Sequence, residues 1–225
     1  MNTQEHVYSV DYINRRQVFY NAVFFAFALA MAVSAAGVYL GLRYGLAFFA
    51  LHPGSVMLLF ALELILIFTS RMWSRTRPLN YLLFSIFALC TGLTLVPLLA
   101  SFMIEFGTGI VLKALMATVS TFLATALIGW TARRSFAGLG SFLFVSLIGL
   151  IITGLIGLFI PWNNTVEMVV SGAAVVIFSG FVMYDIQRIR EFPDDMYIDA
   201  ALMLYLDIFN LFINMLRLLG ALRRN

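Results

Sequence analysis

Long apolar stretches, separated by short polar segments, dominate the pattern along this chain. A helix needs roughly 20 mainly apolar residues to cross the hydrocarbon core of a bilayer. We therefore expect an all-α, polytopic membrane protein, a bundle of seven transmembrane helices in which successive helices run antiparallel. The seven stretches that meet this length cover residues 20–42, 54–73, 79–102, 109–130, 139–160, 166–188 and 198–219.

One helix face of the last predicted span carries a narrow polar stripe. Asp207, Asn210, Asn214 and Arg217 follow at i, i+3, i+7 and i+10, and the residues between them are apolar. This spacing places all four on one side of a helix. Polar groups are costly against hydrocarbon, so the stripe must face protein or a water-filled cavity. We expect the last helix to lie centrally in the bundle, with Asn210 and Asn214 lining a pore or cavity.

The composition supports a membrane protein and leaves no length for a separate soluble domain. Of the 225 residues, 62% are hydrophobic and 11% are charged, against about 45–50% and about 25% in soluble domains. We expect two parts, a cytoplasmic N-terminal segment 1–19 and a transmembrane domain 20–225. The net charge of +3 comes from basic residues spread in twos and threes beside the spans. That distribution encodes orientation in a lipid bilayer, and it does not indicate nucleic-acid binding.

The arginines predict which way the spans run. If seven spans alternate, Arg43 and Lys113 lie on one side and nine arginines lie on the other, with the N-terminus. Cytoplasmic loops are enriched in Lys and Arg, so the N-terminus is expected in the cytoplasm. Arg223 and Arg224 conflict with this enrichment of basic residues in the cytoplasm, because seven crossings leave them outside. A last segment that re-enters the membrane and returns would bring them inside. The nine arginines are Arg15, Arg16, Arg71, Arg75, Arg77, Arg133, Arg134, Arg188 and Arg190.

Two aspartates are spaced so that they can face each other. Asp185 closes the sixth predicted span, and Asp207 follows 22 positions later, across the polar turn 190–195. Both are then at comparable depth on adjacent antiparallel helices. Two carboxylates in a poorly solvated site cannot both ionise cheaply, so the pair can hold one proton between them. Such a pair can sense pH, relay protons or bind Ca²⁺. Alternatively, each aspartate pairs with an arginine, such as Arg188, or caps a helix end.

Glu63 lies in the middle of the second predicted span, between two leucines. A carboxyl group at that depth must be protonated, paired or exposed to water. Two interpretations stay open. The side chain lines a pore or cavity, or it is a protonated acid that joins two helices through a hydrogen bond.

Two further patterns concern the helices themselves. Pro97 removes a backbone hydrogen bond from the third predicted span, so we expect a break there, with Thr94 helping to satisfy the freed carbonyl group. In the fifth span Gly149, Gly154 and Gly157 are spaced as small residues that let helices approach closely. We interpret these glycines as a packing surface.

The remaining chemistry-bearing residue types are sparse. Cys90 is the single cysteine, and His6 and His52 are isolated in the sequence. Neither a nucleophile–base arrangement nor a metal-ligand spacing occurs, so we expect no enzyme activity and no bound cofactor.

Several motifs resemble the transmembrane Bax-inhibitor-motif family, in a bacterial-type member. Residues 184–189, Tyr-Asp-Ile-Gln-Arg-Ile, and 204–212, Leu-Tyr-Leu-Asp-Ile-Phe-Asn-Leu-Phe, look like its paired signature. Residues 91–97, Thr-Gly-Leu-Thr-Leu-Val-Pro, resemble its third-helix motif, and Glu63 resembles its second-helix acid. The resemblance implies a seven-helix fold with a central last helix, in the bacterial cytoplasmic membrane.

The resemblance also implies a function. It points to a pH-sensitive calcium leak governed by a hydrogen-bonded aspartate pair, carried over to Asp185 and Asp207, with Ca²⁺ as the permeant ion. An arginine at the cytoplasmic end of the second helix would latch the sixth-helix aspartate. The register places Ser74 at the latch position, so Arg75 and then Arg71 are the candidates. Some bacterial relatives instead restrain a membrane-anchored AAA protease, which makes a regulatory partner protein the alternative.

Overall fold

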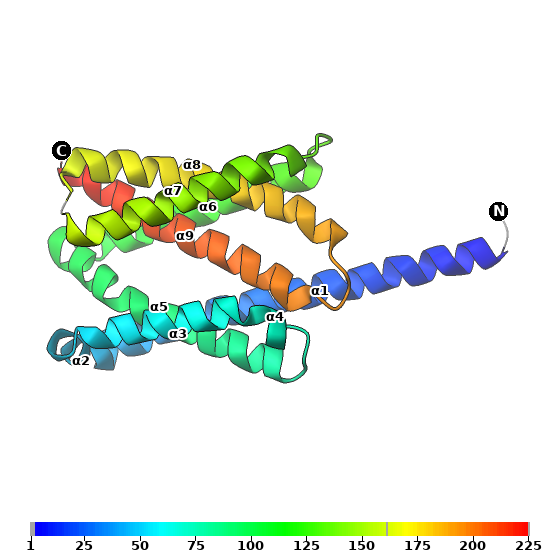
Figure 1. The fold of residues 1–225 in the computed structure, drawn as a ribbon, viewed down its shortest axis with the longest axis horizontal. Coiled ribbons are helices and arrows are strands. Elements are labelled where there is room, and N and C mark those ends of the chain that lie inside the picture. Colours follow the sequence, from blue (N-terminus) through cyan, green and yellow to red (C-terminus); the bar gives the residue numbers. More distant parts are fainter. Residues whose placement is uncertain (1–2, 161, 225) are drawn as a thin grey trace. The chain divides into compact units, whose positions relative to one another are not determined.

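The computed structural model describes residues 3–160 and 162–224, with their side chains except those of residues 3–12 and 158. Residues 1–2 of the predicted N-terminal segment and the His6 side chain lie outside this part. Within it all regular structure is helical and no strand occurs, which confirms the all-α class (Figure 1). The elements are α1 Thr3–Leu40, the π-helical turn η1 Gly41–Gly45, α2 Leu46–Leu51, α3 Gly54–Phe68, α4 Ser70–Trp73, α5 Leu79–Phe106, α6 Gly109–Thr131, η2 Ala137–Leu139, α7 Gly140–Phe159, α8 Asn164–Arg188, η3 Ile189–Glu191 and α9 Tyr197–Arg224.

Six of the seven predicted spans lie in helical segments that are long and apolar enough to cross a bilayer. The predicted span 54–73 is different, because α3 has 15 residues and α4 adds one turn after Thr69. A 15-residue helix rises only about 22 Å, less than the roughly 30 Å of hydrocarbon. Thr69 interrupts the segment with φ −92° and ψ 0°. The described residues therefore contain no single helix over 54–73.

Helix α5 runs through Pro97 without the break that the sequence predicted. The Thr94 hydroxyl lies 3.0 Å from the carbonyl oxygen of Cys90 and shares its one hydrogen between that oxygen and a side-chain acceptor on α3. It does not bond to the carbonyl of Leu93, which loses its usual donor because Pro97 has no N–H. The predicted break is therefore wrong, since a long helix supported by its neighbours tolerates one missing backbone bond.

The chain divides into two compact units, and α5 and α9 each contribute residues to both. The first unit contains Met1–Leu98 and Phe192–Tyr205, and the second unit contains Leu99–Glu191 and Leu206–Asn225.

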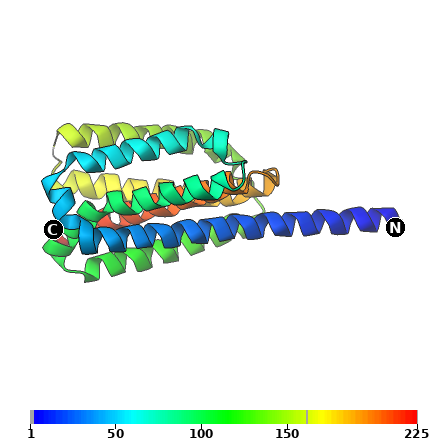
Figure 2. The ribbon, with the colours of Figure 1, turned by 90° about the horizontal axis from the view of Figure 1, so that it is seen from below.

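In the first unit α1 and α5 lie side by side and approach closely (Figure 2). A Cβ atom on Gly37 would lie 2.8 Å from the carbonyl oxygen of Leu89, and one on Gly92 would lie 2.2 Å from that of Ser34. Only glycine permits this separation, as in other close helix pairs in membranes. Tyr205 of α9 is fully buried in the same unit.

In the second unit α6 and α7 both contact α8 (Figure 1). The close approach uses Gly129, where a Cβ atom would lie 2.7 Å from the carbonyl oxygen of Met183. The predicted packing role of Gly149 and Gly154 is wrong, because no described atom lies within 4 Å of a Cβ built on either. A Cβ on Gly157 would meet the Trp162 ring at 3.1 Å, so this glycine does pack closely.

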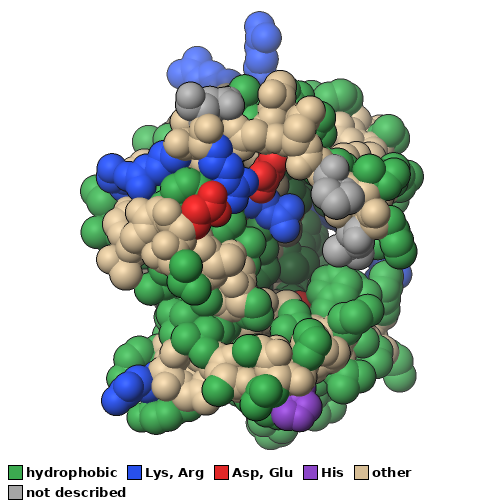
Figure 3. Space-filling model, turned by 90° about the vertical axis from the view of Figure 1, so that its left-hand side faces the viewer, with side chains coloured by type: hydrophobic (Ala, Val, Ile, Leu, Met, Phe, Trp, Pro, Cys, Tyr) green, Lys and Arg blue, Asp and Glu red, His purple; other side chains and the backbone are tan. Residues whose placement is uncertain are grey.

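Helix α9 is one continuous helix of 28 residues, so the re-entrant alternative is not observed. Its end is held within the second unit by ion pairs. The Arg224 guanidinium contacts Glu105 at the end of α5 at 2.8 Å and Glu167 at the start of α8 at 2.7 Å. These acids offset the positive charge of the chain end locally. Figure 3 shows basic and acidic side chains next to one another in one cluster on the face that it draws.

Candidate functional site

Asp185 and Asp207 meet in the second unit. Asp185 lies in the last turn of α8, Asp207 lies in α9, and each is only 5% exposed. The two carboxyl groups lie close enough to act on each other, and the charge of Arg188, one turn further along α8, acts on Asp185. The structure thus brings together the two residues that the spacing placed at one depth.

The chemistry of this pair follows from its contact and its burial. A carboxylate has no hydrogen-bond donor, so a bond between two carboxyl groups requires a proton on one of them. Oδ2 of Asp207 is buried and has no hydrogen-bond partner among the described residues. The arrangement can therefore hold one proton and still offer an oxygen atom to a further donor or to a cation.

Asn210 and Asn214 continue the stripe along α9, and both are half-buried. Their side-chain amides donate back to their own helix, Asn210 to the carbonyl oxygen of Leu206 and Asn214 to that of Asn210, both at 2.8 Å. Arg217, one turn further on, is exposed. The exposure of the side chains therefore rises along the stripe from Asp207 to Arg217. A pore-lining role for the two asparagines stays a prediction.

Glu63 belongs to the first unit, where it is 6% exposed. Its carboxyl group accepts a hydrogen bond from the hydroxyl of Thr94 at 2.5 Å, so it joins α3 to α5. Of the two interpretations that the sequence leaves open, the contact between helices is present. The role in a pore or cavity stays a prediction.

The two latch candidates, Arg71 and Arg75, follow α3 in the first unit, and both side chains are exposed. Arg75 forms an ion pair of 3.5 Å with Asp195, and the two side chains are 55% and 56% exposed. Ser74, at the latch register, is 1% exposed, and its hydroxyl has no hydrogen-bond partner among the described residues. The latch itself stays a prediction.

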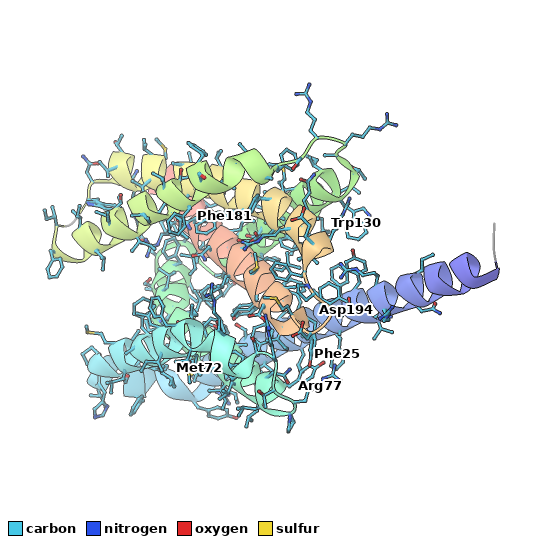
Figure 4. All side chains as sticks on the ribbon, turned by 45° about the vertical axis from the view of Figure 1, so that its right-hand side comes forward. Phe25, Met72, Arg77, Trp130, Phe181 and Asp194 are labelled. Carbon is cyan, nitrogen blue, oxygen red and sulfur yellow. The ribbon has the colours of Figure 1, made fainter. Side chains whose placement is uncertain are left out.

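The sequence did not reveal how the segment before α9 is held in the first unit. Arg16 donates to the carbonyl oxygen of Phe192 at 2.8 Å and to the Asp194 carboxylate at 3.1 Å. Arg77 donates to the hydroxyl of Tyr197 at 2.7 Å. Figure 4 shows Arg77 and Asp194 on this part of the first unit. The opposite charges of Arg16 and Asp194 were the available signal, but their separation of 178 residues hid the contact.

Within the part of the chain that the structure describes, no group of three or more His, Cys, Asp and Glu residues is placed to hold a metal ion. Among the described residues, no third His, Cys, Asp or Glu side chain therefore joins the predicted Ca²⁺ ligands Asp185 and Asp207. Calcium takes 6–8 oxygen ligands, so the two carboxyl groups alone would supply only part of such a ligand set.

Comparison with known proteins agrees with the motifs. A family model described as "Inhibitor of apoptosis-promoting Bax1" matches residues 16–224. Bax inhibitor 1 of Schizosaccharomyces pombe is 34% identical over 176 residues, which cover 78% of this chain and 65% of that protein. The Golgi anti-apoptotic protein of vaccinia virus (strain Lister) is 37% identical over 167 residues, covering 74% and 65% respectively.

A bacterial relative matches over a greater length. An uncharacterized protein of Campylobacter jejuni is 31% identical over 205 residues, which cover 91% of this chain and 88% of that protein. The chain thus spans nearly the whole bacterial relative and about two thirds of the yeast and viral ones. Among the described residues, the family match covers five of the six candidate spans in full and the first one from residue 16 onward. The chain belongs to the Bax inhibitor-1 family of multi-pass membrane proteins.

Proposed function

We propose that this chain is a pH-sensitive calcium leak channel in which Asp185 and Asp207 sense protons. The observation that carries the proposal is that these two carboxyl groups are both buried and close enough to act on each other. If both lost their protons, two like charges would face each other out of bulk water, which is strongly unfavourable. The protonation state of the pair therefore favours one arrangement of α8 and α9 over another.

The proposed gate uses the charge that deprotonation leaves on Asp185. An arginine attracted to that charge would hold the cytoplasmic mouth closed, and protonation would remove the attraction and favour opening. Arg75 is the first candidate for this latch and Arg71 the second. The ion pair of Arg75 with Asp195 is exposed, and exposed pairs contribute only about 0–1 kcal/mol. Arg75 can therefore exchange partners at little cost.

The conduction route and the topology belong to the same proposal. Glu63, Asp207, Asn210 and Asn214 would line the route, with Ca²⁺ as the permeant ion. The protein would cross the bacterial cytoplasmic membrane seven times, with a cytoplasmic N-terminus and a central α9. The ion pairs of Arg224 supply counter-charges for the basic end of α9, so these arginines do not by themselves require a cytoplasmic C-terminus.

Calcium flux into liposomes that contain the purified protein tests the gate from about pH 6 to about pH 8. The leak of the parent protein should rise as the pH falls. Asp185→Asn and Asp207→Asn remove the titrating charge and should each flatten this pH profile. Asp194→Asn is the matched control, since it makes the same change in a half-exposed loop residue, and it should keep the parental profile.

Two results would contradict the proposal. If the parent and both pair variants leaked identically at every pH, the aspartate pair would not be the gate. If the parent leaked no more than empty liposomes and a membrane protease co-purified with it, the regulatory alternative would replace the channel.

A further inference from the structure

A cavity of about 410 Å³ in the first unit is lined by the two latch candidates and also by Ser74, Met196 and Asp199, and the calcium proposal gives no role to the last two residues. Arg71, Ser74 and Arg75 line it from the segment after α3, and Met196 and Asp199 line it from the start of α9. The two arginine side chains are exposed, so the cavity can be reached from their side.

Two residues of the lining each contain a buried polar atom that has no hydrogen-bond partner among the described residues. These atoms are Oγ of Ser74, in a side chain that is 1% exposed, and Oδ2 of Asp199. Buried polar atoms in folded proteins are nearly always bonded, because leaving them unbonded is costly. One atom can donate a hydrogen bond and the other can accept one. A ligand that satisfied both would therefore need an acceptor and a donor.

The charges of the lining indicate what the acceptor is. Arg71 forms no ion pair with any described residue, and Arg75 has only its exposed contact with Asp195 at 3.5 Å. Guanidinium groups bind phosphate oxygens through charge-assisted hydrogen bonds, often in pairs. A phosphate group would also accept a hydrogen bond from the Ser74 hydroxyl.

A phosphate group alone would not satisfy the Asp199 carboxylate, which needs a hydrogen-bond donor. A phosphate oxygen would repel Oδ2 of Asp199, whereas an ammonium group would donate to it. Met196 supplies an apolar wall beside both groups. We propose that this cavity binds a phosphate ester that carries a primary ammonium group, the chemistry of phosphoethanolamine. Its phosphate lies at Arg71, Ser74 and Arg75, its ammonium at Asp199, and its two methylene groups against Met196.

Binding of defined headgroups to the full chain in detergent tests this proposal. The melting temperature is followed while phosphatidylethanolamine, phosphatidylglycerol or phosphatidylcholine is added, since a ligand of the folded state raises it. Phosphatidylethanolamine should bind at least about tenfold more tightly than the other two, because one charged hydrogen bond is worth that factor. Phosphatidylcholine is the sharpest comparison, since its quaternary ammonium has no N–H to donate.

Three variants separate the contributions of the lining. Asp199→Asn should remove the preference for the primary ammonium and keep phosphate binding. Arg71→Gln should weaken binding of all three lipids by about tenfold. Arg133→Gln, an exposed arginine in the second unit, should behave like the parent.

The proposal is overturned if the parent protein binds the three lipids equally, or if Asp199→Asn and Arg71→Gln both match the parent. Should a variant fail to fold, the lipid comparison on the parent protein decides alone. Soluble O-phosphoethanolamine identifies the source of the ligand. Competition with the lipid would assign a soluble metabolite, and its failure to compete would assign the membrane headgroup. The readout is binding and not calcium flux, so it is independent of the channel proposal.

Discussion

Glu63 and Asp207 are both buried carboxyl groups, but their neighbours differ in kind. Glu63 accepts a hydrogen bond from the Thr94 hydroxyl. This hydroxyl is neutral, and it can form a hydrogen bond with the Glu63 carboxyl group whether that group is protonated or ionised. Asp207 instead faces Asp185, and that contact is favourable only while a proton is shared. We therefore expect the contact of Glu63 to contribute stability at every pH, and the pair to respond to pH.

Replacing Thr94 by valine tests the contribution of the Glu63 contact. The change keeps the shape of the side chain but removes the donor, so Glu63 is left buried without this hydrogen bond. We expect the free energy of unfolding in detergent to fall by about 1–3 kcal/mol. Thr125→Val is the matched control, because the Thr125 hydroxyl bonds only to carbonyl groups of its own helix α6. Equal losses in the two variants would show that the Glu63–Thr94 contact contributes nothing.

At the scale of helices, close approach between α1 and α5 depends on single glycines. The carbonyl oxygen of Ser34 occupies the place where a Cβ on Gly92 would lie, at 2.2 Å. A backbone atom cannot move aside as the end of a flexible side chain can. The glycines that the spacing singled out in α7, Gly149 and Gly154, face no described atom within 4 Å. A glycine pattern in a sequence thus does not identify the helix pair that uses it.

Gly92→Ala and Gly149→Ala should consequently change stability in opposite directions. The alanine methyl at position 92 forces α1 and α5 apart, and overpacking of this kind costs about 1–3 kcal/mol or more. At position 149 the methyl group meets open space, and alanine favours a helix over glycine by up to about 1 kcal/mol. Thermal unfolding of both variants in one detergent measures the difference. A Gly92→Ala protein as stable as Gly149→Ala would contradict the close approach.

The sequence predicts features that depend on a local pattern, and it does not predict contacts between positions far apart in the chain. Apolar length is local, so six spans follow directly from the hydropathy pattern. The meeting of Asp185 and Asp207 follows from helical periodicity across one turn. The interruption at Thr69 and the cavity at Ser74 and Asp199 could not be predicted in the same way. The cavity joins positions more than 100 residues apart, which no periodicity connects.

For the whole molecule the number of crossings depends on the segment 54–73. The α3 helix by itself rises about 22 Å, which is short for a bilayer core. Large side chains of α3, including Met57, Leu58 and Phe68, are nevertheless more than 70% exposed. Such a surface is stable against lipid and costly against water. A polar segment with Arg71 and Arg75 follows, and it would complete the crossing by extending the chain to the cytoplasmic headgroups.

Cysteine accessibility in intact cells distinguishes six crossings from seven. His52 and Thr76 flank the segment, both are exposed, and the native Cys90 is buried and can be replaced by alanine. With seven crossings, a membrane-impermeant maleimide should label His52→Cys in intact cells and label Thr76→Cys only after permeabilisation. Ser135→Cys, in the exposed turn after α6, should behave like Thr76→Cys because both loops would face the cytoplasm. Labelling of His52→Cys and Thr76→Cys from the same side would mean that α3 and α4 enter and leave the bilayer on one face. The cavity lined by Arg71 would then lie on the side of Arg43, and the excess of arginines that predicts the orientation would have to be counted again.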